Sequence, residues 1–174
     1  MDPNELLRLA DDLTDGLARY LQLEREIEDA GSRLIDQNPD TFELRAVASI
    51  LEDVYTGAES LCQLIVKRLD RAQPTGKRWH KELLEQVSVE APGIRPAVLQ
   101  PITVERIDRY RSFRHVARNI YGAELDWELL AELLAKSPTT MDLFSQDIRQ
   151  FVTFLQMITA DLSTSPSDKD NPSP

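Results

Sequence analysis

The stretch VASILEDVYTGAESLCQLIVKRL, residues 47–69, repeats apolar side chains at steps of three and four residues. That spacing places them on one face of an α-helix, because the helix makes a turn about every 3.6 residues. The stripe consists of Val47, Ile50, Val54, Ala58, Leu61, Ile65 and Leu69, with Leu51 and Cys62 beside it. The stretch therefore predicts a long helix that packs along one side.

The preceding residues predict a second long helix, from about Pro3 to Gln37. Its apolar side chains recur mainly at the same steps: Leu6, Leu9, Leu13, Leu17, Tyr20, Ile27 and Leu34. Gly16 and Gly31 are expected to weaken this helix locally. The intervening NPDTFE, residues 38–43, reads as a turn followed by a helix start. The two helices are therefore predicted to form an antiparallel hairpin.

Shorter elements are predicted further along the chain. In order, we expect a break over 72–78, a short helix over 79–88, an irregular Pro-rich connection over 91–101, a helix over about 102–121, a short helix over 127–136 capped by Asp126, and a last helix over 138–162 that starts anew at Ser137-Pro138. The alternation typical of strands is absent. The prediction is an all-α antiparallel four-helix bundle with additional short helices.

Composition favours one cytoplasmic domain. Residues 1–162 are expected to form it, and residues 163–174 have no apolar side chain and should be disordered. No apolar run approaches the roughly 18–20 residues that span a bilayer, and the acidic N-terminus does not resemble a secretory signal. Cys62 is the single cysteine, so an internal disulfide is impossible.

Charge is distributed unevenly along the chain. The net charge of −10 argues against a general nucleic-acid coat, because phosphate binding depends largely on positive charge. Residues 101–121 nevertheless hold five arginines against two acids, a balance of +3, so the remainder carries −13. A local positive field on an acidic body suits one defined anionic ligand better than a broad surface.

Most of these cations share one side of the helix over 102–121. A helical projection places Arg111, Arg114, His115, Arg118 and Asn119 opposite the apolar face of Tyr110, Phe113, Val116, Ala117 and Ile120, with Tyr121 at the border. The polar groups could converge on a phosphate. They could equally form a solvated face whose arginines pair with neighbouring acids.

Other chemistry receives little support. His80 has no second histidine near it in the sequence, so no metal site is expected there. There is no Gly-rich phosphate loop and no serine elbow motif. Cys62 lies on an apolar stripe and is expected to be buried and inert.

The segment RSFRHVARNIYGAELDW, residues 111–127, resembles the motif region of HEPN-superfamily proteins, and more narrowly of HepT-like proteins of bacterial toxin–antitoxin modules. Their pattern is an arginine, a polar residue, three further positions, a histidine, any residue and a tyrosine. Arg114, His115 and Tyr121 match its arginine, polar neighbour and tyrosine. Asn119 stands where the family's ribonucleases carry histidine. The resemblance covers about residues 1–160.

The resemblance implies a HEPN-like bundle that acts as a metal-independent endoribonuclease without a cofactor. A ribose 2′-hydroxyl would attack the adjacent phosphorus, with Arg114, His115 and Asn119 as catalytic residues and Arg111 and Arg118 binding RNA. Arginine suits phosphate because its planar fork binds two oxygens and stays charged. Asparagine takes no proton near neutral pH, so a base at this site would have to be another group, with His115 as the candidate.

The resemblance also implies partners. Such proteins form homodimers in which two motif helices line one cleft, and an MNT-type nucleotidyltransferase acts as the antitoxin. This enzyme would attach adenylyl groups to Tyr121, adding negative charge that opposes RNA phosphate. Two alternatives stay open. The chain could be a catalytically degenerate HEPN module that binds RNA or the nucleotidyltransferase without cleaving, or a helical scaffold with an ordinary arginine face.

Overall fold

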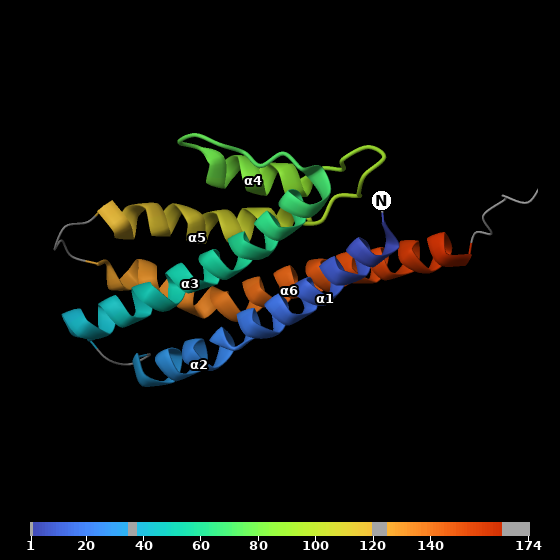
Figure 1. Cartoon of the computed structure of the whole chain (residues 1–174). Coiled ribbons are helices and arrows are strands. Elements are labelled where there is room, and N and C mark those ends of the chain that lie inside the picture. The colour runs from blue at the N-terminus through green and yellow to red at the C-terminus, as the bar shows by residue number, and fades with distance from the viewer. Residues whose placement is uncertain (1, 35–37, 120–124, 165–174) are drawn as a thin grey trace, which may run out of the picture.

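The computed structural model describes residues 2–34, 38–119 and 125–164, and these form an all-α bundle (Figure 1). Its elements are α1 (Pro3–Leu21), α2 (Leu23–Leu34), α3 (Thr41–Ile65), the π-helical turn η1 (Val66–Asp70), α4 (Trp79–Ser88), α5 (Pro101–Asn119) and α6 (Trp127–Thr164). The described residues contain no β-strand, only an isolated bridge between Ala91 and Arg95. The predicted fold class is thereby confirmed.

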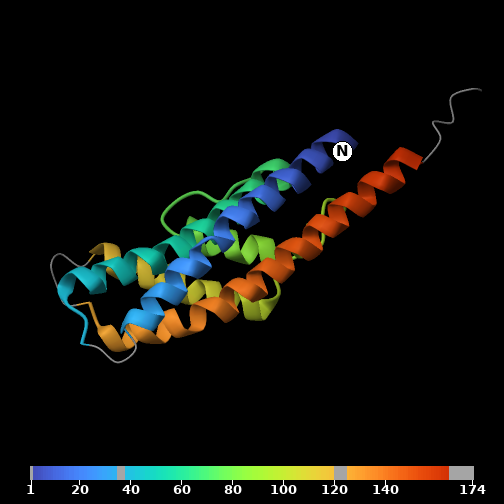
Figure 2. The same cartoon turned by 90° about the horizontal axis from the view of Figure 1, so that it is seen from below.

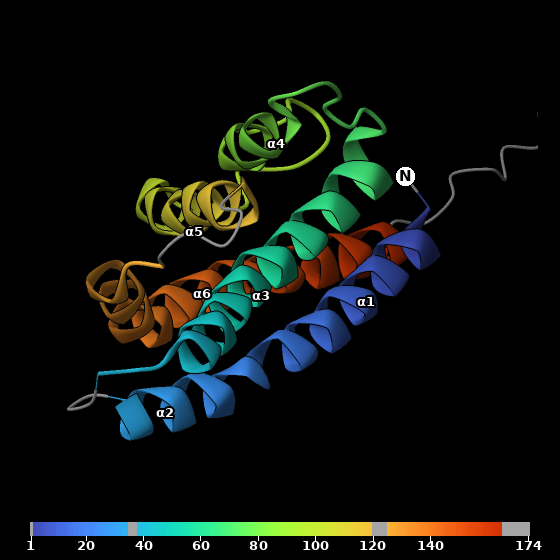
Figure 3. The same cartoon turned by 90° about the vertical axis from the view of Figure 1, so that its left-hand side faces the viewer.

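Four long units make up the bundle. The α1–α2 unit, α3, α5 and α6 alternate in direction along the chain, as the colour gradient of Figure 1 shows. α3 and α6 lie between the α1–α2 unit on one side and α4 with α5 on the other (Figure 3). α1 runs beside α6 over much of its length (Figure 2). The short helix α4 packs on α3 and α5, and this contact positions the candidate site.

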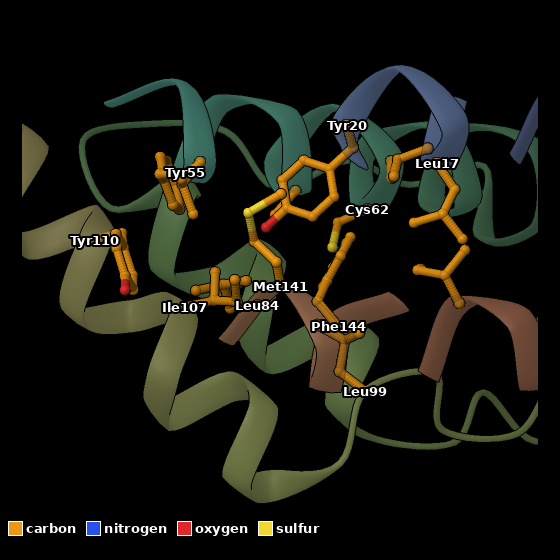
Figure 4. Packing of buried hydrophobic residues seen from close by; sticks show 14 of the residues in the cluster. Leu17, Tyr20, Tyr55, Cys62, Leu84, Leu99, Ile107, Tyr110, Met141 and Phe144 are labelled. Atoms are coloured by element: carbon orange, nitrogen blue, oxygen red, sulfur yellow. The ribbon is translucent and has the colours of Figure 1, made fainter. Parts of the chain in front are cut away.

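The core is continuous across these helices. Tyr20 of α1 meets Phe144 of α6 edge to face, with ring centroids 5.3 Å apart, and Cys62 of α3 lies beside them (Figure 4). Tyr55 and Tyr110 are both buried at the α3–α5 side of the same cluster. Residues far apart in the sequence therefore share one apolar interior, which fixes how the helices face one another.

The long N-terminal helix predicted over Pro3 to Gln37 is divided in the structure. α1 ends at Leu21, where the Gln22 N–H donates to the Arg19 carbonyl at 3.1 Å in a tightened turn, and α2 begins at Leu23. Neither glycine nor proline marks this break, so the sequence carried no signal for it. Residues 35–37, which the prediction included in the helix, lie outside the described residues.

Two glycines, Gly16 of α1 and Gly57 of α3, lie at close contacts between these helices. A Cβ at Gly16 would come within 2.6 Å of a Leu61 methyl carbon, and a Cβ at Gly57 within 2.6 Å of the Tyr20 ring. A side chain at either position would require the facing Leu61 or Tyr20 side chain to move. Gly16 therefore marks a point of close contact in the core.

The predicted start of α3 is confirmed. The Asp40 carboxylate accepts hydrogen bonds from the N–H groups of Phe42 and Glu43, and the Glu43 carboxylate accepts one from the Asp40 N–H. This reciprocal capping box satisfies N–H groups that otherwise have no helical partner. It fixes the residue at which the helix begins, and hence which faces of α3 meet α5 and α6.

The break predicted at Ser137-Pro138 was wrong, because α6 runs through both residues. Proline in a helix interior deprives the carbonyl four residues earlier of its donor and costs about 3 kcal/mol. Packing against α5 keeps the helix continuous here. The Tyr110 hydroxyl donates to the Leu133 carbonyl at 2.9 Å, and Leu133, Leu134 and Ser137 are all buried. The short helix capped by Asp126 is therefore the first part of α6, and the cap itself is present.

A buried ion pair fixes the irregular connection between α4 and α5. The Arg95 guanidinium donates to both carboxylate oxygens of Asp70, at 2.8 and 2.7 Å, and its side chain is only 1% exposed. Its remaining N–H groups donate to the carbonyls of Gln86, Val89 and Pro96. The connection is thus tied to the end of η1 and to α4.

Burial makes Cys62 a probe of the core. It is fully buried, and desolvation raises the pKa of its thiol to about 12. Because the thiolate is the reactive form, we expect iodoacetamide to leave the folded protein unlabelled at mildly alkaline pH and to label it fully in concentrated guanidinium chloride. Mass spectrometry measures both. Rapid labelling under native conditions would contradict this picture of the core.

Two expectations concern the chain's surroundings and its end. No helix among the described residues is long and apolar enough to cross a membrane. Of the tail expected to be disordered, residues 163 and 164 continue α6, and residues 165–174 lie outside the described residues. The division into a domain over 1–162 and a disordered tail stays a prediction.

Candidate functional site

The polar side of α5 and the start of α4 enclose a cationic pocket of about 450 Å³. Its lining consists of Lys77, Arg78, His80, Lys81, Arg111, Arg114, His115 and Arg118. Every one of these side chains carries a positive charge or an imidazole, although the chain as a whole has a net charge of −10. The pocket thus concentrates a positive field on one place, which suits an anionic ligand.

Arg114 is the arginine whose surroundings best fit an anion. Its guanidinium carbon lies 5.7 Å from the centroid of the Tyr55 ring, a cation–π arrangement that holds the side chain against α3. Its Nε is buried and finds no hydrogen-bond partner among the described residues. A buried donor without a partner costs about 1–3 kcal/mol. The guanidinium as a whole lines the cationic pocket, where its other N–H groups can donate to a phosphate.

The flanking arginines are partly neutralised. Arg111 Nε donates to Asp108 at 2.6 Å, and this hydrogen bond raises the pKa of Arg111, so the guanidinium remains charged. Arg118 donates to Glu52 of α3 at 3.3 Å. Arg111 and Arg118 therefore fit the alternative in which the arginines of this helix face pair with neighbouring acids. Arg114, in contrast, makes no ion pair within the part of the chain that the structure describes.

His80 joins the site through contacts that the sequence did not indicate. Its Nδ1 lies in a very short contact with Oε1 of Glu59, a carboxylate buried on α3. The Tyr55 hydroxyl donates to the same oxygen at 2.7 Å. Burial, and then this hydrogen bond, raise the pKa of Tyr55, so the hydroxyl remains a donor. The imidazole also stacks on Trp79, with ring centroids 3.7 Å apart.

The structure brings together most of the residues singled out in the sequence. Arg111, Arg114, His115 and Arg118 line the cationic pocket, while Tyr110 and Phe113 are buried on the opposite side of α5. Asn119 is the last residue of α5, but the position of its side chain lies outside what the structure describes, as do the side chain of Val116 and all of Ile120 and Tyr121.

No second histidine lies near His80 in the sequence, but one shares its pocket in the structure. The chain has two histidines, His80 and His115, and both line the cationic pocket. They are distant in sequence, and only the packing of α4 on α5 brings them together. Among the described residues, no group of three or more His, Cys, Asp or Glu side chains could hold a metal ion.

A comparison with known protein families identifies the family of this chain. A model of the HepT-like protein family matches residues 46–155, which is more than half of the chain and includes the entire cationic pocket. The chain belongs to the HepT-like family. This places it in the HEPN superfamily, in agreement with the all-α bundle. No curated protein and no solved structure shows a significant match to it. Of this HepT-like chain, α1 and α2 lie outside the matched residues.

Proposed function

We propose that this protein is a HepT-like toxin of a toxin–antitoxin module that cleaves RNA without a metal ion. The observation that carries the proposal is the cationic pocket, in which Arg114 makes no ion pair within the part of the chain that the structure describes. Membership of the HepT-like family supports the same conclusion. An RNA phosphate supplies the negative charge and the oxygen acceptors that such a pocket lacks.

The residues of α5 take distinct roles in this proposal. Arg114 binds the scissile phosphate through its planar fork and stabilises the charge that develops in the transition state. Arg111 and Arg118 hold the neighbouring RNA backbone. His115 exchanges a proton with the reacting groups. Asn119 hydrogen-bonds to the substrate and orients it, because an amide takes no proton near neutral pH.

A homodimer completes the site. Two copies of α5 facing one cleft would double the number of arginines along the RNA path, which favours a long polyanion over a small ligand. The acidic remainder of each copy would repel RNA elsewhere and so confine it to the cleft. The proposed site is therefore composite, with Arg114, His115, Asn119 and Tyr121 drawn from both protomers.

An MNT-type nucleotidyltransferase is the proposed antitoxin. It would transfer adenylyl groups to the hydroxyl of Tyr121, which in the sequence follows the last residue of α5 by two positions. Added phosphate at that position would compete with RNA for the arginines by charge and bulk. The cell would thereby hold an inactive toxin without degrading it.

An RNA cleavage assay in EDTA tests the proposed function. We expect the purified protein to cut single-stranded RNA and to leave 2′,3′-cyclic phosphate and 5′-hydroxyl ends, which gel mobility before and after phosphatase treatment distinguishes. The matched control is the same oligonucleotide with a 2′-deoxy sugar at the cut position, which should stay intact because it lacks the nucleophile. Equal cutting of the control, or activity that appears only with added metal, would refute the mechanism.

The degenerate HEPN module is the second candidate, and Asn119 favours it. The loss of a proton-accepting group costs about 10²–10⁴-fold in rate when nothing replaces it. If this candidate is correct, the natural chain binds RNA at low salt without cutting it, and Asn119→His creates cleavage. Cleavage by the natural chain at a rate that Asn119→His does not raise would exclude the candidate.

A further inference from the structure

We propose that His80, oriented by Glu59, is the general base of the cationic pocket and that His115 supplies the proton to the leaving group. The inference rests on the proposed ribonuclease function and names the proton-transfer residues of that same site. It assigns the base to α4, a helix that contributes none of the residues singled out by the sequence motif on α5.

The surroundings of His80 are those of a positioned imidazole rather than of an ordinary surface side chain. Its Nδ1 contacts the Glu59 carboxylate, so Nδ1 carries the proton and Nε2 is the nitrogen left to accept one. Stacking on Trp79 and an edge contact with Tyr55, at 6.0 Å between centroids, hold the ring plane. The side chain is still 29% exposed, and it lines the cationic pocket.

Glu59 has the features of a group that supports such a base. Its side chain is 8% exposed, and the Tyr55 hydroxyl donates to the same oxygen that contacts His80. A carboxylate held behind an imidazole fixes its tautomer and stabilises the positive charge that forms when Nε2 takes a proton. Without His80, this buried carboxylate would keep only the hydrogen bond from Tyr55 among the described residues.

Tyr55 also connects the base to the phosphate-binding group. The Arg114 guanidinium lies over the Tyr55 ring at 5.7 Å, and the His80 imidazole meets the same ring edge on. One aromatic side chain of α3 therefore holds both groups beside the same pocket. His115 faces this pocket from α5 and is exposed, so the chain's only two imidazoles both border it.

The two imidazoles allow a balanced reaction. His80 Nε2 takes the proton of the ribose 2′-hydroxyl while the 2′ oxygen forms a bond to phosphorus. The bond from phosphorus to the 5′ oxygen breaks, and that oxygen leaves with its electron pair and a proton from the His115 imidazolium. The products are a 2′,3′-cyclic phosphate and a 5′-hydroxyl, and proton exchange with water restores both side chains. Arg114 neutralises the charge on the phosphoryl oxygens throughout.

The first test replaces His80 without removing the donor that Glu59 requires. In His80→Asn, an amide N–H can stand in for Nδ1–H, so we expect an unchanged melting temperature by circular dichroism and unchanged affinity for 2′-deoxy-substituted RNA. RNA cleavage should fall by about 10²–10⁴-fold. In His80→Ala, added imidazole should restore part of the activity, which a merely structural role for His80 would not produce.

The second test separates base from acid with uridine 3′-(4-nitrophenyl phosphate). Its nitrophenolate leaves without a proton, so an acid is unnecessary while a base is still required. We expect His115→Ala to lose RNA cleavage but to retain ester cleavage, and His80→Asn to lose both. The ester reaction is followed by the yellow colour of nitrophenolate. Loss of both reactions in His115→Ala, with both retained in His80→Asn, would assign the base to His115 and overturn the proposal.

Glu59 is tested as a positioning residue. Glu59→Gln keeps the size and a hydrogen bond but removes the charge that stabilises the imidazolium. We expect kcat to fall by about 10- to 100-fold with KM unchanged. An unchanged kcat would overturn the role of Glu59.

The outcomes distinguish this proposal from the function on which it rests. If the natural chain cleaves both substrates and His80→Asn cleaves them equally fast, the assignment of His80 is wrong while the ribonuclease function stands. If the natural chain cleaves neither RNA nor the nitrophenyl ester in EDTA, the proposed function is wrong and the inference falls with it.

Discussion

Replacing Arg95 with methionine is expected to lower the free energy of unfolding by about 3–5 kcal/mol. The reason is the charge that remains. Asp70 is 8% exposed and accepts two hydrogen bonds from Arg95, so the substitution leaves a buried carboxylate with only the Gln86 amide, which donates to it at 2.6 Å. The carbonyls of Val89 and Pro96 in the α4–α5 connection, and that of Gln86 in α4, lose this donor as well. Urea denaturation followed by circular dichroism measures the effect.

Two controls sharpen this prediction. Arg68→Ala removes an ion pair with Asp12 in which both side chains are more than 40% exposed, and it should cost at most about 1 kcal/mol. The double variant Arg95→Met/Asp70→Leu should be more stable than Arg95→Met alone, because no unpaired charge is left behind. A cost for Arg95→Met no greater than that for Arg68→Ala would show that the buried ion pair contributes no more to stability than an exposed one.

Arg114→Ala is expected to lower kcat/KM for RNA cleavage by about 10²–10³-fold, the usual cost of losing one charged donor to a transition state. The side chain makes no ion pair among the described residues, so its removal should change stability little. Arg114→Lys keeps the charge but loses the planar fork and should recover only part of the rate. Initial rates with a labelled oligonucleotide in EDTA provide the comparison.

Arg109 offers the matched control for this prediction. It lies on the same helix, but it donates to Glu132 of α6 at 2.7 Å and lies outside the cationic pocket. Arg109→Ala removes the same charge from α5 and should leave the rate within about threefold, because the lost field acts at a distance through water. Equal losses in Arg109→Ala and Arg114→Ala would mean that general charge, rather than a site at Arg114, governs activity.

Features with a local cause could be predicted from the sequence. The stripe from Val47 to Leu69 is buried in the structure except for Ile50, which is partly exposed, because a helical period decides which side chains share a face. The helix WHKELLEQVS begins and ends at the predicted residues. The start of α3 follows from Asp40 and Glu43, whose side chains act within one turn.

The helix boundaries that were predicted wrongly depend on tertiary packing. Local rules predict a break at Pro138, but this turn packs against α5, with a hydrogen bond from Tyr110, and the helix continues through it. The break at Gln22 is marked by no residue type, and α1 and α2 each pack on α6 on either side of it.

Only the α5 side of the candidate site could be predicted from the sequence. Periodicity shows that Arg111, Arg114 and Arg118 share a face of α5, but not which helix covers that face. The contact between His80 and Glu59 could not be predicted from the sequence, because it joins α4 to α3 and depends on the packing of α4. The available signal in the sequence was Glu59, which lies beside the apolar stripe of α3. A carboxylate buried at such a position requires a cationic partner.

The placement of α1 and α2 determines which fragments of this protein can fold and stay in solution. They cover sides of α3 and α6 that carry Leu61 and Phe144, yet they precede the residues shared with the family. A fragment cut to residues 46–155 would expose these apolar sides to water and lose the glycine-mediated fit of Gly57 against Tyr20. Such a fragment is expected to aggregate, so a dissolved fragment needs α1 and α2 in addition to the residues shared with the family.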